Sequence, residues 1–388
     1  MKRAAILATL IGLAACQAPG PISIPGITRA PQSGEEALEA YYRTLPDDFF
    51  PVAPAGLPPP SGDTALTRIL VGSCLDEERG DSATLRTVAA TPADLFLMIG
   101  DNVYGDKDGA AYRVGDADLT ELRESFSDLA ARPDFQAVRQ VHPMMVAWDD
   151  HDYGLNDGGK HFAFRRLAER IHERFWGLAD KDVGAWPGTY YARTFGPEGK
   201  RTQIIMLDTR FFRSDLTYTD DASVKGQERY APSSDPNQDM LGNDQWTWLE
   251  NELQKPADLR LIVSSIQVIP NVHGWEAWSR LPAEQQRLYS LINETGANGV
   301  VFVSGDRHTG FLYRNDGILP YPAYEITASS LNASEATETD EKDESQVGAG
   351  YPPENFGSLD INWDEGSVTL SIHASDGATV EEVTDTFR

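Results

Sequence analysis

The stretch Leu95-Phe96-Leu97-Met98-Ile99-Gly100-Asp101-Asn102-Val103-Tyr104 joins a continuous apolar run directly to a group of polar residues. Strands that are buried on both faces read as continuous apolar runs, so residues 95–99 predict a buried strand. Open α/β sheets place their functional sites at the carboxyl ends of such strands. Asp101 and Tyr104 are three residues apart, and one turn can aim both side chains at a common point.

Three other apolar runs end in polar residues in the same way. They are 67–72, followed by Ser73-Cys74; 144–148, followed by Asp149-Asp150-His151-Asp152; and 300–304, followed by Gly305-Asp306-Arg307-His308. Four strands of this kind can bring one thiolate, several carboxylates, one phenol and two imidazoles together. Adjacent carboxylates repel each other unless a cation neutralises them. The sequence therefore predicts a metal site built for hydrolysis.

The candidate ligands differ in the metal that they suit. Asp101 offers two oxygens and can bridge two metals, and a Tyr104 phenolate suits a hard, acidic cation such as Fe(III). Asn156 offers a neutral oxygen, which suits Ca²⁺. Asp306 and His308 are two residues apart and can face the same side. The alternative for Tyr104 is a packing aromatic.

Two further residues are candidates for the chemistry itself. His151 is well placed as a general acid or a phosphate-binding group, with Asp150 on a metal and Asp152 orienting the ring. The alternative is a capped helix start with a solvent-facing histidine. Arg210 can clamp a phosphate with two hydrogen bonds or hold Asp208 in a structural ion pair. Candidates to line the pocket follow the apolar run 261–266: Gln267, Asn271 and His273.

The amino terminus carries the pattern of an exported lipoprotein. Residues 1–16 comprise a basic start, a short apolar stretch and Leu13-Ala14-Ala15-Cys16, which is typical of a signal peptide ending in a lipidated cysteine. The alternative is an ordinary secretory signal that contains a cysteine. The chain has two cysteines. If Cys16 carries lipid, Cys74 cannot form an intramolecular disulfide, and metal ligation explains why it is retained. The alternative for Cys74 is a buried, inert thiol.

The formal net charge of −27 disfavours nucleic acid and anionic membrane surfaces as non-specific partners. It does not exclude phosphorylated substrates, because the cations of a site dominate its local field. The residue after Cys16 is Gln17, not an acidic residue, and the host is taken to be Gram-negative. We therefore expect a protein anchored in the outer membrane and facing the periplasm.

The rest of the chain reads as a Pro/Gly-rich tether followed by one α/β domain (α+β type). The tether covers residues 17–65, with one short helix near 33–43, and the domain covers 66–388 with a C-terminal β-hairpin after Ser358. Further strands are expected at 189–194, 202–208 and 260–266. Helices are expected at 118–131, where Pro133 ends the run, 161–176, 242–253 with Asn243 as its cap, and 282–294.

Together, these motifs resemble the PhoD-like alkaline phosphatase D family, distant relatives of the calcineurin-like metallophosphoesterases. The matching pieces are Gly72-Ser73-Cys74, 100–106, 148–157, Leu207-Asp208-Thr209-Arg210 and 304–308. The resemblance implies a four-layer αββα sandwich of two mixed sheets with an Fe(III) and Ca²⁺ centre. It implies Cys74, Asp101, Tyr104 and Asp306 as iron ligands. It implies Asp101, Asp150, Asn156 and His308 as ligands of the calcium-type site, and His151 as a contact to the scissile phosphate.

The sequence departs from the family pattern in two places. Only a linker-like segment precedes the domain, where other members carry a β-rich domain, and residues 267–275 lack the glycine-histidine pattern of the wider superfamily. The expected function is a lipid-anchored metallophosphoesterase that hydrolyses phosphate mono- or diesters. The alternatives are a phosphodiesterase directed at phospholipids and a non-catalytic, calcium-binding surface lipoprotein on the same fold.

Overall fold

The computed structural model describes residues 33–107, 115–179, 182–219, 228–334 and 341–387 and divides the chain into two compact units, 1–46 and 47–388. The first unit contains α1 (Gly34–Tyr42), which the sequence predicted, and the Ser33 side chain accepts a hydrogen bond from the Glu36 backbone. The expected signal peptide and Cys16 lie outside the described residues. Among the described residues, no helix is both long and apolar enough to cross a membrane.

The second unit begins inside the segment that was expected to be a tether. Residues between 53 and 62 hydrogen-bond to the domain through their backbones: Ala53 donates to Phe175, and the Gly62 carbonyl accepts from Gly196. A Pro-rich composition gives no periodic pattern, yet its remaining backbone groups can still pair with neighbouring loops. Residues 47–65 therefore belong to the domain by their contacts.

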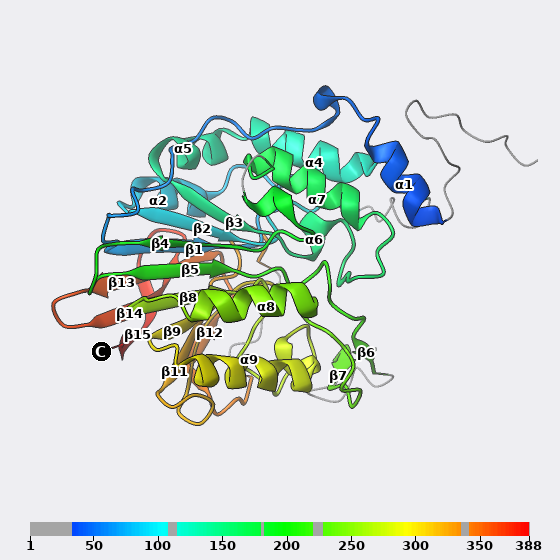
Figure 1. Ribbon diagram of the computed structural model, residues 1–388. Helices are drawn as coiled ribbons and strands as arrows, with labels where there is room; N and C mark the ends of the chain where they lie inside the picture. Colours follow the sequence, from blue (N-terminus) through cyan, green and yellow to red (C-terminus); the bar gives the residue numbers. More distant parts are fainter. Residues whose placement is uncertain (1–32, 108–114, 180–181, 220–227, 335–340, 388) are drawn as a thin grey trace, which may run out of the picture. The chain divides into compact units, whose positions relative to one another are not determined.

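Two large mixed sheets form the centre of the second unit (Figure 1). The first has the order β15–β14–β13–β1–β2–β3, and the second has the order β12–β10–β11–β9–β8–β5–β4. Strands of the first sheet are β1 (Arg68–Gly72), β2 (Leu95–Ile99), β3 (Met144–Ala147), β13 (Asn355–Asn362), β14 (Ser367–Ala374) and β15 (Thr379–Thr386). Strands of the second are β4 (Tyr191–Phe195), β5 (Thr202–Met206), β8 (Leu259–Val263), β9 (Val300–Ser304), β10 (Gly310–Asn315), β11 (Ala323–Thr327) and β12 (Gln346–Tyr351). A short ribbon pairs β6 (Thr217–Tyr218) with β7 (Tyr230–Ala231).

The sheets face each other and helices cover their outer faces. Strands β10 and β11 contact β13 and β14 across the interface. Figure 1 places α4, α5 and α7 on the side of β1–β3, and α8 and α9 on the side of β8. Helix bounds are α2 (Ala83–Ala90), α4 (Thr120–Ala131), α5 (Pro133–Val141), α6 (Asp150–Tyr153), α7 (Arg165–Trp176), α8 (Gly242–Leu253) and α9 (Pro282–Thr295). This arrangement confirms the predicted αββα sandwich.

Three local expectations differ from the structure. Pro133 ends α4 but also begins α5, because proline at the first helical position loses no helical hydrogen bond. Asn243 lies inside α8, where the N-cap is Leu241 without a side-chain hydrogen bond. The carboxyl-terminal tail forms three antiparallel strands, and β13 pairs with β1, so the tail is part of the first sheet.

Candidate metal centre

The predicted polar groups meet where both sheets present the carboxyl ends of their parallel strands. Cys74 follows β1, Asp101 follows β2, α6 starts at Asp150 after β3, and Asp306 follows β9. Backbone hydrogen bonds join these ends: Leu75 donates to the Asp101 carbonyl at 2.8 Å, and Gly305 donates to the Ser265 carbonyl at 2.8 Å. The polar residues that follow these four buried strands therefore lie close together at the carboxyl ends of the strands.

The backbone at this place adopts conformations that side chains other than glycine rarely adopt. The φ angles of Cys74, Asp101, Asp306 and His308 are 56°, 48°, 68° and 52°. Left-handed backbone conformations of this kind cost free energy and concentrate at functional sites. Gly100, just before Asp101, has a φ of 115°, and a Cβ there would lie 2.6 Å from the Asp149 Cβ. Glycine is thus required for the two strand ends to approach.

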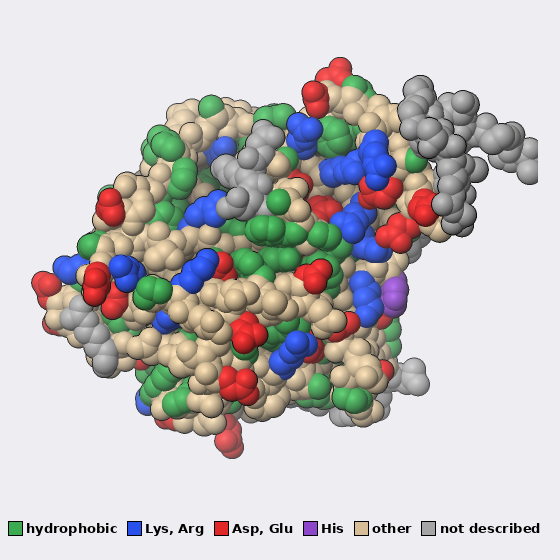
Figure 2. Space-filling view, viewed as in Figure 1, with side chains coloured by type: hydrophobic (Ala, Val, Ile, Leu, Met, Phe, Trp, Pro, Cys, Tyr) green, Lys and Arg blue, Asp and Glu red, His purple; other side chains and the backbone are tan. Residues whose placement is uncertain are grey.

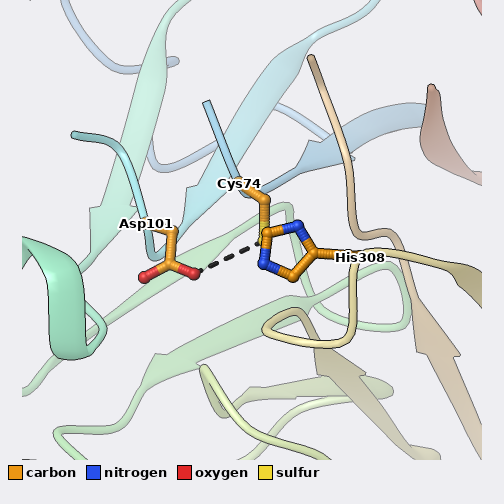
Figure 3. A group of neighbouring side chains, drawn as sticks. All are labelled: Cys74, Asp101 and His308. Atoms are coloured by element: carbon orange, nitrogen blue, oxygen red, sulfur yellow. Dashed lines mark hydrogen bonds between the residues drawn. The ribbon is translucent and has the colours of Figure 1, made fainter. Parts of the chain in front are cut away.

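A first group of potential ligands consists of Cys74, Asp101 and His308, whose side chains point toward one another (Figure 3). The Cys74 Sγ lies 3.4 Å from the Asp101 Oδ2. The His308 Nδ1 donates a hydrogen bond to the Ala333 carbonyl. This bond fixes the ring's tautomer so that the Nε2 lone pair is available as a ligand.

Tyr104 completes this group. Its hydroxyl and the Asp101 Oδ1 are buried and have no hydrogen-bond partner among the described residues. Burial and the nearby negative charges of Asp101 and Cys74 raise the pKa values of the Tyr104 phenol and the Cys74 thiol well above their usual ranges. A cation among these atoms would reverse that effect and satisfy both orphaned oxygens. A thiolate, a phenolate, a carboxylate and an imidazole fit a strongly acidic transition-metal ion such as Fe(III).

A second group consists of four carboxylates: Asp101, Asp149, Asp150 and Asp306. Burial, together with the charges of the neighbouring carboxylates, raises the pKa values of Asp101 and Asp306 well above their usual range. Burial also raises the pKa of Asp149, to about 7, although Arg210 opposes the shift. An all-oxygen donor set of this kind fits a hard cation such as Ca²⁺. Asp101 belongs to both groups, as expected for a bridging ligand.

The structure places two of the expected ligands, His308 and Asp306, in the opposite groups from those that the resemblance implied. His308 groups with Cys74 and Asp101, although it was assigned to the calcium-type site, and Asp306 groups with Asp149 and Asp150, although it was assigned to iron. The two residues differ by two positions on one loop. Sequence spacing alone could not tell which of them faces the thiol.

A pocket of about 660 Å³ opens onto the two groups. Asn156, which was expected to be a ligand of the calcium-type site, lines it, and so do residues of both groups. Its walls are mostly charged and consist of Asp76, Asp101, Tyr104, Asp106, Lys107, Asp150, His151, Asn156, Asp157, Arg229, Trp275, Glu276, Asp306, Arg307 and His308.

His151 lies in this pocket, but Asp152 does not orient its ring. The His151 Nδ1 donates to the Asp106 Oδ1 at 2.5 Å. Asp152 instead accepts hydrogen bonds from the backbones of Asn102 and Asp149, at 3.0 and 2.9 Å, and so caps α6. The catalytic role expected for Asp152 is therefore corrected to a structural one. Asp106 belongs to the quoted 100–106 motif, but nothing in that motif indicates its partner.

Arg210 is fully buried and does not line the pocket. Its guanidinium forms ion pairs with Asp149 and, at 2.6 Å, with Glu276. Both alternatives from the sequence are thus corrected: Arg210 is not placed to clamp a phosphate, and its ion-pair partner is not Asp208. Asp208 accepts backbone hydrogen bonds from Arg210 and Phe211 instead.

The structure adds two acidic residues that sequence reasoning missed. Asp157 and Glu276 form a further group of potential ligands with Asp150, and both line the pocket. His151 also groups with Asp101 and Asp150. Glu276 follows no strand directly, so its position gave no signal. Gln267 and His273, which were expected near the pocket, are buried behind it, where the His273 Nε2 bonds to the Gln267 Oε1 at 3.0 Å. Asn271 does not line the pocket either.

The sandwich and its strand-end metal groups define a metallophosphoesterase-like protein. The chain belongs to the PhoD-like phosphatase family, whose sequence profile matches residues 69–157 and 189–377. A curated relative, alkaline phosphatase D of Bacillus subtilis (strain 168), is 24% identical over 284 residues, which are 66% of this chain and 48% of the relative. The chain thus spans about half the length of the curated relative that it matches.

The solved structure of PhoD agrees with this chain in its fold. A structure of PhoD has a TM-score of 0.62 at 16% identity and covers 85% of this chain and 70% of that one. A dimetal phosphatase from Danio rerio covers 84% of this chain and 100% of its own, at 13% identity and a TM-score of 0.47.

Proposed function

We propose that this chain is a metal-dependent phosphoester hydrolase that acts on phosphate mono- or diesters. The observation that carries the proposal is the meeting of Cys74, Asp101 and His308 with the carboxylate group in one pocket. Membership of the PhoD-like phosphatase family supports it. Left-handed backbone of the kind that holds these side chains together concentrates at catalytic and ligand-binding sites.

The metals that we propose are Fe(III) and Ca²⁺. Cys74, Asp101, Tyr104 and His308 would hold the iron, and Asp101, Asp149, Asp150 and Asp306 would hold the calcium, with Asn156 nearby on the pocket wall. When bound, the two cations supply charge neutralisation for the phosphate and a water molecule of lowered pKa.

The chain's own residues handle the leaving group. Without bound cations, burial opposes protonation of His151, but Asp150 and Asp101, together with the hydrogen bond to Asp106, raise the pKa of its imidazole well above the usual value. The centroid of this ring lies 4.2 Å from that of the Tyr104 ring, and both residues line the pocket. With its Nδ1 held by Asp106, the Nε2–H of His151 can protonate the departing oxygen.

We also propose that the protein is exported and anchored by lipid on Cys16, in the outer membrane facing the periplasm. The Leu13-Ala14-Ala15-Cys16 pattern supports this. The face of the molecule in Figure 2 shows acidic and basic side chains interspersed over most of its area, with several Lys and Arg side chains close together on the right.

Paired assays test the activity. Purified protein would be supplied with an aryl phosphate and with the corresponding bis-aryl diester, before and after a chelator removes the metals. The proposal predicts hydrolysis of at least one ester, its loss on chelation, and its return when iron and calcium are added together. Stable metal binding without hydrolysis of either ester would instead support the non-catalytic, calcium-binding alternative.

A further inference from the structure

Among the described residues that line the pocket, one large aromatic side chain is well exposed. Of the aromatic rings among the described residues that line it, the Tyr104 ring is 8% exposed, whereas Trp275 is 40% exposed. The other lining residues are mostly charged or polar. An exposed indole in the wall of a charged pocket offers a ligand an apolar ring face on which to stack.

Backbone hydrogen bonds at Gly274 and Trp275 hold the segment that carries the indole. The Gly274 carbonyl accepts hydrogen bonds from the backbones of Arg229 and Tyr230, at 3.3 and 2.7 Å, and the Gly274 backbone donates to Glu228 at 2.5 Å. The Trp275 backbone itself donates to the His273 Nδ1 at 3.2 Å. The backbone under the indole is therefore held in place.

His273 ties this segment to the inner wall of the pocket. Its ring accepts at Nδ1 and donates from Nε2 to the Gln267 Oε1, so it is a neutral imidazole in one tautomer. The same Gln267 oxygen accepts a hydrogen bond from Arg307 at 2.8 Å. Arg307 lines the pocket beside Asp306 and His308. A chain of hydrogen bonds thus connects the Trp275 backbone, through His273 and Gln267, to Arg307 beside the potential metal ligands.

Trp275 also immediately precedes Glu276, one of whose carboxylate oxygens lies within 4.8 Å of the ligand atoms of Asp150 and Asp157. A phosphate held at the metal groups would therefore have its ester substituent near this wall. Flat rings, nucleobases among them, stack on exposed aromatic side chains.

We propose that Trp275 is a specificity-determining residue that stacks on a flat aromatic ring in the leaving group. The substrates would be phosphate esters of aryl alcohols or of nucleosides, which share this chemistry. The inference rests on the proposed function, because it assigns the substrate class of the same site.

The test compares esters that differ in ring shape but not in the ester bond. Benzyl phosphate and cyclohexylmethyl phosphate form one pair, and a nucleoside 5′-monophosphate and ribose 5-phosphate form the other. The ratio of kcat/KM within each pair should favour the aromatic ester. Trp275→Ala should lower that ratio about tenfold, and Trp275→Phe should retain most of it. A ratio that falls in only one pair identifies the aryl or the nucleoside ester as the better ligand.

Two controls separate the possible failures. Trp186→Ala removes a half-buried indole that stacks on Tyr190 and does not line the pocket, so the ratio should not change. Binding of benzylphosphonate and cyclohexylmethylphosphonate, which the protein cannot hydrolyse, measures stacking without turnover. An unchanged ratio and an unchanged phosphonate preference in Trp275→Ala would overturn the inference. Absence of hydrolysis with a preference that depends on Trp275 would overturn the proposed function alone.

Discussion

Cys74 is the residue that most sharply distinguishes a metal centre from a buried acidic cluster. Its Sγ is completely buried and contacts the Asp101 carboxylate and, at 3.1 Å, the Ser329 hydroxyl. Without a cation, burial beside Asp101 raises the pKa of the thiol well above its usual value. A bound metal would convert this thiol to a thiolate ligand.

Cys74→Ser should therefore keep the fold and lose iron, because a hydroxyl is a poorer anionic ligand than a thiolate at neutral pH. Elemental analysis measures the iron, and circular dichroism checks the fold. Cys16→Ser, at the chain's other cysteine, is the matched control and should keep its iron. Unchanged iron in a folded Cys74→Ser protein would refute the ligand assignment.

The pair of Asp106 and His151 leads to a second prediction at this scale. His151→Asn should slow esters with poor leaving groups far more than activated aryl esters, by up to roughly 10²–10⁴-fold. Asp106→Asn should show the same pattern more weakly, since it removes the partner that orients the ring. A leaving-group series on each variant, with metal content determined in parallel, measures both effects.

Asp152→Asn distinguishes the structural assignment from the one based on sequence. Asp152 caps α6, so its substitution should lower thermal stability without a leaving-group trend. If Asp152→Asn reproduces the His151→Asn pattern, Asp152 and not Asp106 supports the ring. A uniform rate loss with loss of metal in His151→Asn would show that His151 is itself a ligand.

At the scale of single elements, helix α7 carries a buried histidine that makes stability depend on pH. His172 is fully buried and packs against Trp148 and Phe126, and within the described part of the chain its ring nitrogens have no hydrogen-bond partner. Burial lowers the pKa of this imidazole to about 3, whereas the unfolded chain would titrate near its ordinary value of 6.5. Below about pH 6.5 the unfolded chain therefore binds a proton that the folded chain excludes.

The expected result is a loss of stability as the pH falls from about 6.5 toward 3, by about 2 kcal/mol at pH 5. His172→Leu should remove this part of the pH dependence, while His161→Leu, whose side chain is 69% exposed, should not. Chemical denaturation of the three proteins at pH 7 and pH 5 measures the difference. Equal losses in wild type and His172→Leu would show that the histidine is protonated in the fold.

Elements that the sequence predicted correctly are those with continuous apolar runs. Residues 95–99 and 300–304 are β2 and β9 with the expected bounds, and their polar followers Asp101 and Asp306 reach the site. Such a run indicates that the strand is buried, and the polar residue that follows the run indicates where the strand ends. Fold and site therefore share one sequence signal.

The parts that the sequence did not predict depend on contacts between distant segments. Asp106 and His151 are 45 residues apart, and Arg210 and Glu276 are 66 residues apart, so their pairing follows from the way the two sheets meet. The same holds for β13, whose place beside β1 was not evident from the alternating pattern of the tail. Spacing along the chain carries no information on such pairs.

For the whole molecule, we expect a lipid on Cys16 to anchor the domain to a membrane. Cys16 should be the only lipidation site, and fractionation should place the wild-type protein in the outer membrane of a Gram-negative host. Cys16→Ala should shift it to the soluble periplasmic fraction. A wild-type protein that is already soluble there, with no shift in the variant, would refute the anchor.

The central claim is that this sandwich binds two metals at the ends of β1, β2, β3 and β9. Anomalous diffraction from crystals of the purified protein, recorded on both sides of the iron edge, tests it most directly. We expect an iron peak among Cys74, Asp101, Tyr104 and His308. A second metal that is not iron should lie among Asp101, Asp149, Asp150 and Asp306. A folded, active protein with no metal at either position, or with iron only among the four carboxylates, would contradict it.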